Sequence, residues 1–110
     1  MLDDTLAKLE SRVRNLASVP DDKKAELAAL VATLRREVGT LSHTQAGSAE
    51  SITRFAELST HEATRPGANA ELQKLSLDGL SASVKGFEAS HPRLVDSANG
   101  ICTLLSNLGI

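Results

Sequence analysis

The side chains that could do chemistry in this chain are few and widely spaced. Its three histidines lie at His43, His61 and His91. A protein zinc site needs about four converging ligands, and a strong sequence sign is a pair of ligands on one helical face, as in HExxH. The chain has no HExxH, and no two of its histidines lie three or four residues apart. We therefore expect exposed histidines in polar connecting segments, and no metal ligand is assigned.

The most distinctive stretch of the chain is FEASHP, which contains Glu88 and His91. These two residues could form an acid–base or ligand pair, with His61 as a further ligand. The same stretch also reads as a corner between two helices. Pro92 suits the first position of a helix, and Ser90 or His91 would cap it. Because the corner accounts for every residue without further assumptions, it is the favoured interpretation.

No nucleophile stands out either. The single cysteine, Cys102, lies close to Ile101 and Leu104, with no basic residue within four positions. A reactive thiol needs exposure and an electropositive neighbour, so a buried and inert cysteine is expected. The chain has no GxSxG elbow and no glycine-rich phosphate loop. The sequence therefore predicts a protein that is not an enzyme, with no catalytic or cofactor-binding residue.

The charges also argue against a polyanionic partner. Twelve basic and 14 acidic side chains are interspersed and give a net charge of −2. A nucleic-acid footprint would need Arg12, Arg14, Arg35 and Arg36 to share one face. No apolar run approaches the roughly 18 residues of a membrane span, and the acidic residues 3–4 are unlike the basic start of a signal peptide. We expect a cytoplasmic protein that binds neither nucleic acid nor membrane.

The elements that carry these residues are predicted to be helices. Four apolar stripes step along the chain by three or four residues, which places each stripe on one helical face. The stripes are Leu2, Leu6, Leu9, Val13 and Leu16; Leu27, Val31, Leu34, Val38 and Leu41; Leu77, Leu80, Val84 and Phe87; and Leu94, Ala98, Ile101, Leu105 and Leu108. Pro20 and Pro92 mark the starts of the second and last helices, and Ser18 or Asp21 could cap the second.

The chain is accordingly divided into an N-terminal helical hairpin over residues 1–41, a flexible linker over 42–69 and a C-terminal hairpin over 70–110. The linker is rich in small polar residues and can hold one short helix near Phe55. The helix that begins near Ala70 is expected to run to about residue 90, through two glycines that each cost about 1 kcal/mol. The fold class is all-α, either a four-helix bundle within a single domain or a coiled-coil-like oligomer.

The C-terminal third, FEASHPRLVDSANGICTLLSNLGI, resembles the closing signature of an uncharacterised bacterial family of short helical proteins, a domain of unknown function. That signature is FExxHPxL followed by LSNxGI. The matching residues are Phe87, Glu88, His91, Pro92, Leu94, Leu105, Ser106, Asn107, Gly109 and Ile110. The resemblance implies a bacterial cytoplasmic protein and brings no activity, so these residues are interpreted as structural. Gly109 suits a left-handed helix stop, from which Ile110 would fold back.

Four amphipathic stripes without a cluster of polar groups beside them predict a non-enzymatic protein–protein interaction or scaffold module. Its expected partner is itself, as a homodimer, or another helical protein. The alternative is a small metal- or ligand-binding protein that uses the corner of Glu88 and His91.

Overall fold

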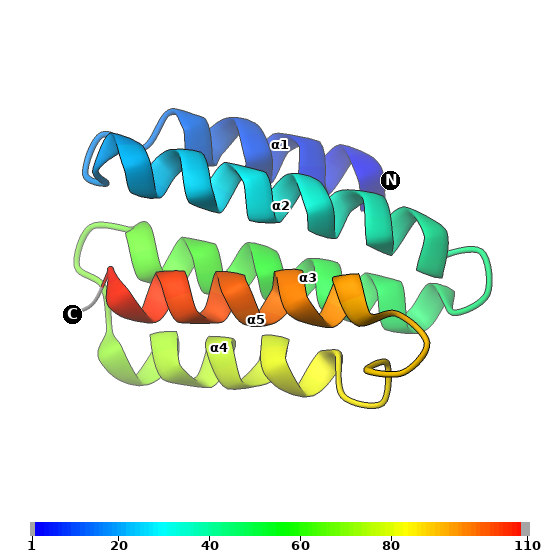
Figure 1. Cartoon of the computed structure of the whole chain (residues 1–110). Coiled ribbons are helices and arrows are strands. Elements are labelled where there is room, and N and C mark those ends of the chain that lie inside the picture. The colour runs from blue at the N-terminus through cyan, green and yellow to red at the C-terminus, as the bar shows by residue number, and fades with distance from the viewer. Residues whose placement is uncertain (1, 109–110) are drawn as a thin grey trace.

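The computed structural model describes residues 2–108, which form helices without any strand. The helices are α1 (Leu2–Arg14), α2 (Asp21–Leu41), α3 (Ala46–Thr64), α4 (Ala70–Ser83) and α5 (Pro92–Asn107). Consecutive helices run in opposite directions along a common long axis, as Figure 1 shows. The all-α fold class is confirmed. Within the described residues, no helix is both long and apolar enough to cross a membrane.

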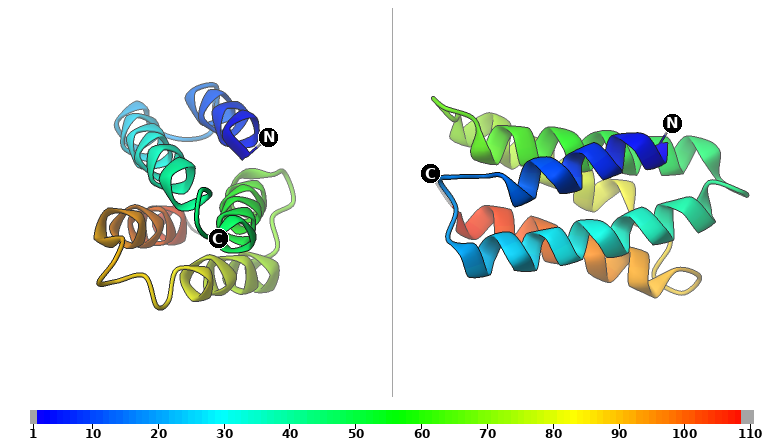
Figure 2. Two further views of the ribbon diagram at one scale, coloured as in Figure 1. Left: turned by 90° about the vertical axis from the view of Figure 1, so that its right-hand side faces the viewer. Right: turned by 90° about the horizontal axis from the view of Figure 1, so that it is seen from above.

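The end-on view shows how the helices surround the core (Figure 2, left). The largest contacts join α1 to α2, α2 to α5 and α3 to α4. Helices α4 and α5 follow one another in the chain, but each packs more on α3 or α2 than on the other. Helices α4 and α5 therefore pack mainly on the helices that precede them, and the core is shared by all five helices of residues 2–108.

The N-terminal pair follows its predicted stripes. Every residue of the α2 stripe is at most 1% exposed, and on α1 the central three residues, Leu6, Leu9 and Val13, are buried to the same degree. Pro20 occupies the N-cap position of α2 with ψ of 147°, and no side chain caps the helix. The expected cap from Ser18 or Asp21 is thus wrong, since the fixed φ of Pro20 is what sets the entry into the helix.

Residues 42–69 differ most from the expectation. Where a flexible linker with one short helix was predicted, the structure has the 19-residue helix α3, with Ala49, Ile52 and Ala56 wholly buried. Its buried face also contains Thr53, Ser59 and Thr60, whose hydroxyls donate to carbonyls of their own helix. Apart from Ile52 and Glu62, this face is formed by small and hydroxyl side chains, so it leaves no stripe of large apolar residues in the sequence.

Helix α4 is shorter than expected. The Asn69 side chain caps it by accepting from the Leu72 amide at 3.0 Å. The helix ends at Ser83 and not near residue 90, because Gly86 takes a φ of +95°, which lies outside helical geometry. Gly79 does lie in the helix interior. A Cβ at that position would overlap the Phe55 ring, so this glycine allows α4 to lie close to α3.

Helix α5 begins with Pro92, as predicted, and buries its whole stripe from Leu94 to Leu105. His91 is the N-cap residue but makes no capping hydrogen bond with its side chain, so the expected cap from Ser90 or His91 is wrong. The predicted helix stop at Gly109 and Ile110 lies outside the described residues.

Candidate functional site

The corner between α4 and α5 contains the first three signature residues, Phe87, Glu88 and His91. Phe87 and His91 pack edge to face, with ring centroids 5.8 Å apart and planes at 85°. The imidazole Nδ1 of His91 lies 3.0 Å from the Ser90 hydroxyl. One carboxylate oxygen of Glu88 accepts from the Gly86 amide at 2.8 Å. Each of these contacts joins residues of the same connection between α4 and α5.

The other signature residues continue this pattern along α5. Leu94 is wholly buried in the core next to the corner, and Leu105 is buried at the far end of the helix. Asn107 is the last residue of α5. The carbonyl of Leu105 accepts a hydrogen bond of 3.0 Å from the buried Gln73 amide of α4. The described part of the signature therefore joins α5 to the bundle and presents no shared set of polar groups.

The alternative metal site would need His61 to join Glu88 and His91. His61 lies in the last turn of α3, and α4 then runs its full length before the corner begins, so the two places are at opposite ends of the bundle. His43 lies in the connection between α2 and α3. Among residues 2–108, no group of three or more histidine, cysteine or acidic side chains is placed to hold a metal ion.

Cys102 is half-buried on α5. Its thiol donates to the Leu77 carbonyl of α4 across a distance of 3.6 Å. Burial raises the pKa of the Cys102 thiol, and the nearby carboxylate of Asp78 raises it further. Both effects disfavour the thiolate, which is the reactive form. The cysteine therefore contributes to packing between α4 and α5.

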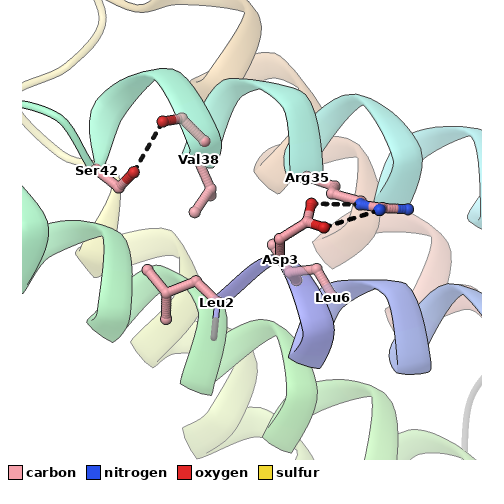
Figure 3. Close-up of a pocket in the computed structure, with 7 residues that line it drawn as sticks. Leu2, Asp3, Leu6, Arg35, Val38 and Ser42 are labelled. Atoms are coloured by element: carbon pink, nitrogen blue, oxygen red, sulfur yellow. Dashed lines mark hydrogen bonds and ion pairs between the residues drawn. The ribbon is translucent and has the colours of Figure 1, made fainter.

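A hollow with a volume of about 430 Å³ lies between α1 and α2 (Figure 3). Asp3 of α1 and Arg35 of α2 close one side of it through two hydrogen bonds of 2.6 and 2.9 Å. The hydrogen bonds from Arg35 lower the pKa of Asp3, against a smaller opposing effect of desolvation. The Ser42 hydroxyl donates to the Gly39 carbonyl at 2.8 Å. Asp3 and Arg35 thus bind each other, and the Ser42 hydroxyl donates to a backbone carbonyl and not to a base that could activate it.

The arginines that a nucleic-acid interface would use are engaged separately. Arg14 pairs with Glu10 at 2.8 Å on α1, and Arg35 pairs with Asp3. Arg36 donates to the Thr33 hydroxyl at 3.3 Å. Acidic partners therefore accompany two of these four arginines.

Known proteins add no comparison. No family model, curated protein or solved structure matches this chain. The resemblance of the C-terminal third to a bacterial family stays an expectation, and the function must be argued from the chain itself.

The feature that sequence reasoning missed is a surface patch of leucines. Leu58 of α3 is 44% exposed, and Leu72 and Leu75 of α4 are 46% and 58% exposed. Leu58 lies one turn beyond Phe55, and Leu75 lies one turn before Gly79. Because Phe55 packs on Gly79 and the two helices are antiparallel, both leucines lie on the same side of that contact and next to each other.

Leu72 extends this surface by one further turn of α4, and we call the three residues the α3–α4 leucine patch. The sequence contains one sign of this patch, since Leu72 and Leu75 fall outside the stripe that begins at Leu77. It does not show that residues 46–64 form a full helix, which is what brings Leu58 beside these two leucines. A surface of adjacent exposed leucines is typical of a binding site for another protein.

Proposed function

We propose that this protein is a non-enzymatic interaction module that binds a helical surface through the α3–α4 leucine patch. The observation that carries the proposal is the exposure of Leu58, Leu72 and Leu75 side by side, in a chain whose other large aliphatic side chains are mostly buried. Placing such side chains against a partner removes apolar area from water, which favours association by about 25 cal/mol per Å² before the costs of binding.

The shape of the patch favours a helical partner. Two antiparallel helices leave a shallow surface between them, and an amphipathic helix or helical hairpin can place its apolar face there. The partner is a second copy of the chain or another helical protein of the same compartment, for which the cytoplasm is proposed. The resemblance to a bacterial family of short helical proteins fits a module of this size.

Photo-cross-linking within cells tests this proposal. A benzophenone side chain replaces Leu75 in the full chain, and a matched variant carries it at Ser11, an exposed residue of α1. After irradiation, Leu75 should give one discrete adduct with another protein chain, whereas Ser11 should give none. If neither Leu75 nor Leu58 variants form an adduct while both remain folded, the patch does not bind protein and the proposal is wrong.

A further inference from the structure

We infer that the partner of the α3–α4 leucine patch is a second copy of this chain, with α3 of each copy lying on α4 of the other. This inference rests on the proposed function and adds the identity and the orientation of the partner. It follows from the spacing and the charge of the residues that flank the leucines.

Two short stripes on α3 and α4 share one spacing and carry opposite charge. On α3, Leu58 lies between Arg54, four residues before it, and His61, three residues after it. On α4, Leu75 lies between two acidic residues at the same steps of four and three, which are Glu71 and Asp78. Residues at such steps lie on one helical face, and all four flanking residues are exposed.

These stripes are complementary when they run in opposite directions. With Leu58 of one copy on Leu75 of the other, Arg54 meets Asp78, and His61 meets Glu71. The histidine is a hydrogen-bond donor and becomes a cation when protonated. Each contact therefore pairs an acidic side chain with a basic one or a donor, around a leucine centre.

The arrangement also satisfies two-fold symmetry. Helices α3 and α4 lie side by side and antiparallel along one side of the bundle (Figure 2, left). A rotation about an axis parallel to both helices places α3 of each copy on α4 of the other, so every contact occurs twice, as an isologous interface requires. The alternative two-fold pairing places α3 on α3 and α4 on α4. It brings Arg54 to His61 and Glu71 to Asp78, which is unfavourable for both stripes.

Contacts with neighbours on their own helices now engage three of these residues, but they do not prevent the exchange. The longest is at His61, whose Nε2 lies 3.9 Å from a carboxylate oxygen of Glu62 and forms an ion pair only when the histidine is protonated. Arg54 pairs with Glu50 within α3, and their side chains are 72% and 52% exposed. Asp78 pairs with Lys74 within α4, again between well-exposed side chains. Exposed pairs of this kind contribute little to stability, so rearranging them costs little compared with covering the leucines.

The test measures mass in solution with charge-reversed variants. Light scattering with refractive-index detection over a concentration series suits a chain without Trp or Tyr. The unmodified chain should approach twice its monomer mass of 11.6 kDa. A dimer of the Arg54→Asp variant would place the new carboxylate at position 54 against Asp78 in both contacts. A dimer of the Asp78→Arg variant would likewise place the new guanidinium at position 78 against Arg54. Each variant alone should dimerise at least about tenfold more weakly.

An equimolar mixture of the two variants gives the decisive result. In a mixed dimer, the new carboxylate of one chain meets the new guanidinium of the other, and the unchanged Arg54 and Asp78 meet at the second contact. Dimers should therefore return on mixing. Arg36→Asp, the same reversal on the exposed surface of α2, should leave the mass unchanged. Leu75→Glu should give monomers, and circular dichroism confirms that each variant is folded.

Three outcomes would overturn the inference. They are a monomer at every concentration, a dimer that persists in folded Leu75→Glu, and weakened single variants that do not recover on mixing. None of them affects the proposed function if position 75 still forms an adduct with a different protein in cells. Conversely, a dimer that uses another face, together with no adduct at the patch, would mean that both proposals fail.

Discussion

Helices α2 and α3 occupy equally central places in the bundle but are buried through different kinds of side chain. The buried face of α2 consists mainly of leucine and valine, with Leu34 and Val31 wholly buried. The buried face of α3 has one large aliphatic residue, Ile52, and one acidic residue, Glu62, among alanine, serine and threonine. The difference shows that a helix can be central without a hydrophobic stripe, provided that its neighbours can approach closely.

The buried faces of α2 and α3 also stabilise the fold by different physical means. Large side chains on α2 stabilise the fold by removing apolar area from water, at about 25 cal/mol per Å². Small side chains on α3 remove less area per residue, and the close packing of α3 on α4 is seen where the Phe55 ring lies against Gly79. The hydroxyls on this face are satisfied by carbonyls of α3 itself, as with Thr53 and Ala49 at 2.8 Å, so they need no partner from another helix.

The largest expected effect is the loss of a leucine from α2. Leu34→Ala should lower the free energy of unfolding by about 2–5 kcal/mol, because a wholly buried site loses the transferred surface and gains a cavity. Urea denaturation gives this value. The matched control is Leu72→Ala on α4, at a side chain that is 46% exposed, and its loss should be well below that of Leu34→Ala. Both variants are measured at the same low protein concentration, because dimerisation would increase the free energy of unfolding. Equal losses of unfolding free energy in the two variants would contradict the assignment of Leu34 to the core and of Leu72 to the surface.

The second prediction concerns the close approach of α3 and α4. Gly79→Ala places a Cβ against the Phe55 ring, so overpacking of about 1–3 kcal/mol should exceed the helix-propensity gain of about 1 kcal/mol. A net loss of up to about 2 kcal/mol is expected. Gly39→Ala on α2 meets nothing within 4 Å and should instead gain up to about 1 kcal/mol.

A double-mutant cycle then assigns the cause of that loss. In a Phe55→Leu background, Gly79→Ala should cost less than in the unmodified chain, because the ring that the new methyl group meets is gone. If the cost of Gly79→Ala is the same in both backgrounds, Phe55 is not the constraint, and the role given to the glycine is wrong.

The same contrast explains how far sequence reasoning could go. Stripes of leucine and valine recur with the helical period, so α1, α2 and α5 were predicted from their spacing. Pro20 and Pro92 marked the starts of two of these helices. The short helix predicted near Phe55 fell well short of the full length of α3, because Thr53, Ser59 and Thr60 on its buried face look like linker residues. The end of α4 was missed because a glycine that ends a helix and one that allows close packing look alike in a sequence.

The candidate surface was missed for a related reason. A sequence does not distinguish exposed leucines from core leucines unless the positions of the neighbouring helices are known. The position of Leu58 beside α4 follows only once residues 46–64 are known to form the full helix α3. By contrast, the contacts of Phe87, Glu88 and His91 at the corner join residues that lie only a few positions apart in the chain. Local chemistry is visible in a sequence, whereas a surface shared by two helices is not.

The third prediction separates polarity from size on the α3 face. Thr60 is 2% exposed, and its hydroxyl donates to the Ala56 carbonyl at 2.9 Å. That carbonyl also accepts from Ser59, so Thr60→Val leaves it with a partner and should change stability by no more than about 1 kcal/mol. Thr60→Leu should cost more, about 1–3 kcal/mol, because the face has no room for a larger side chain. Chemical denaturation of both variants is the measurement. A larger loss for valine than for leucine would mean that the hydroxyl, and not the volume, matters.

The smallest effect is expected at the exposed edge of α2, where Arg35 binds Asp3 of α1. The hydrogen bonds from Arg35 hold the pKa of Asp3 below its usual value of about 3.9. A carboxyl whose pKa is lower in the folded state stabilises the fold above the unfolded pKa, and this contribution is lost as the pH falls through the folded pKa. The difference in melting temperature between the unmodified chain and Asp3→Asn should therefore be small and constant from about pH 5 to 8, and it should shrink below about pH 4. Added salt should reduce it further, since both side chains face water. A difference that grew as the pH fell would mean that Asp3 is not stabilised as a carboxylate, and that the contact between α1 and α2 depends on its apolar stripes alone.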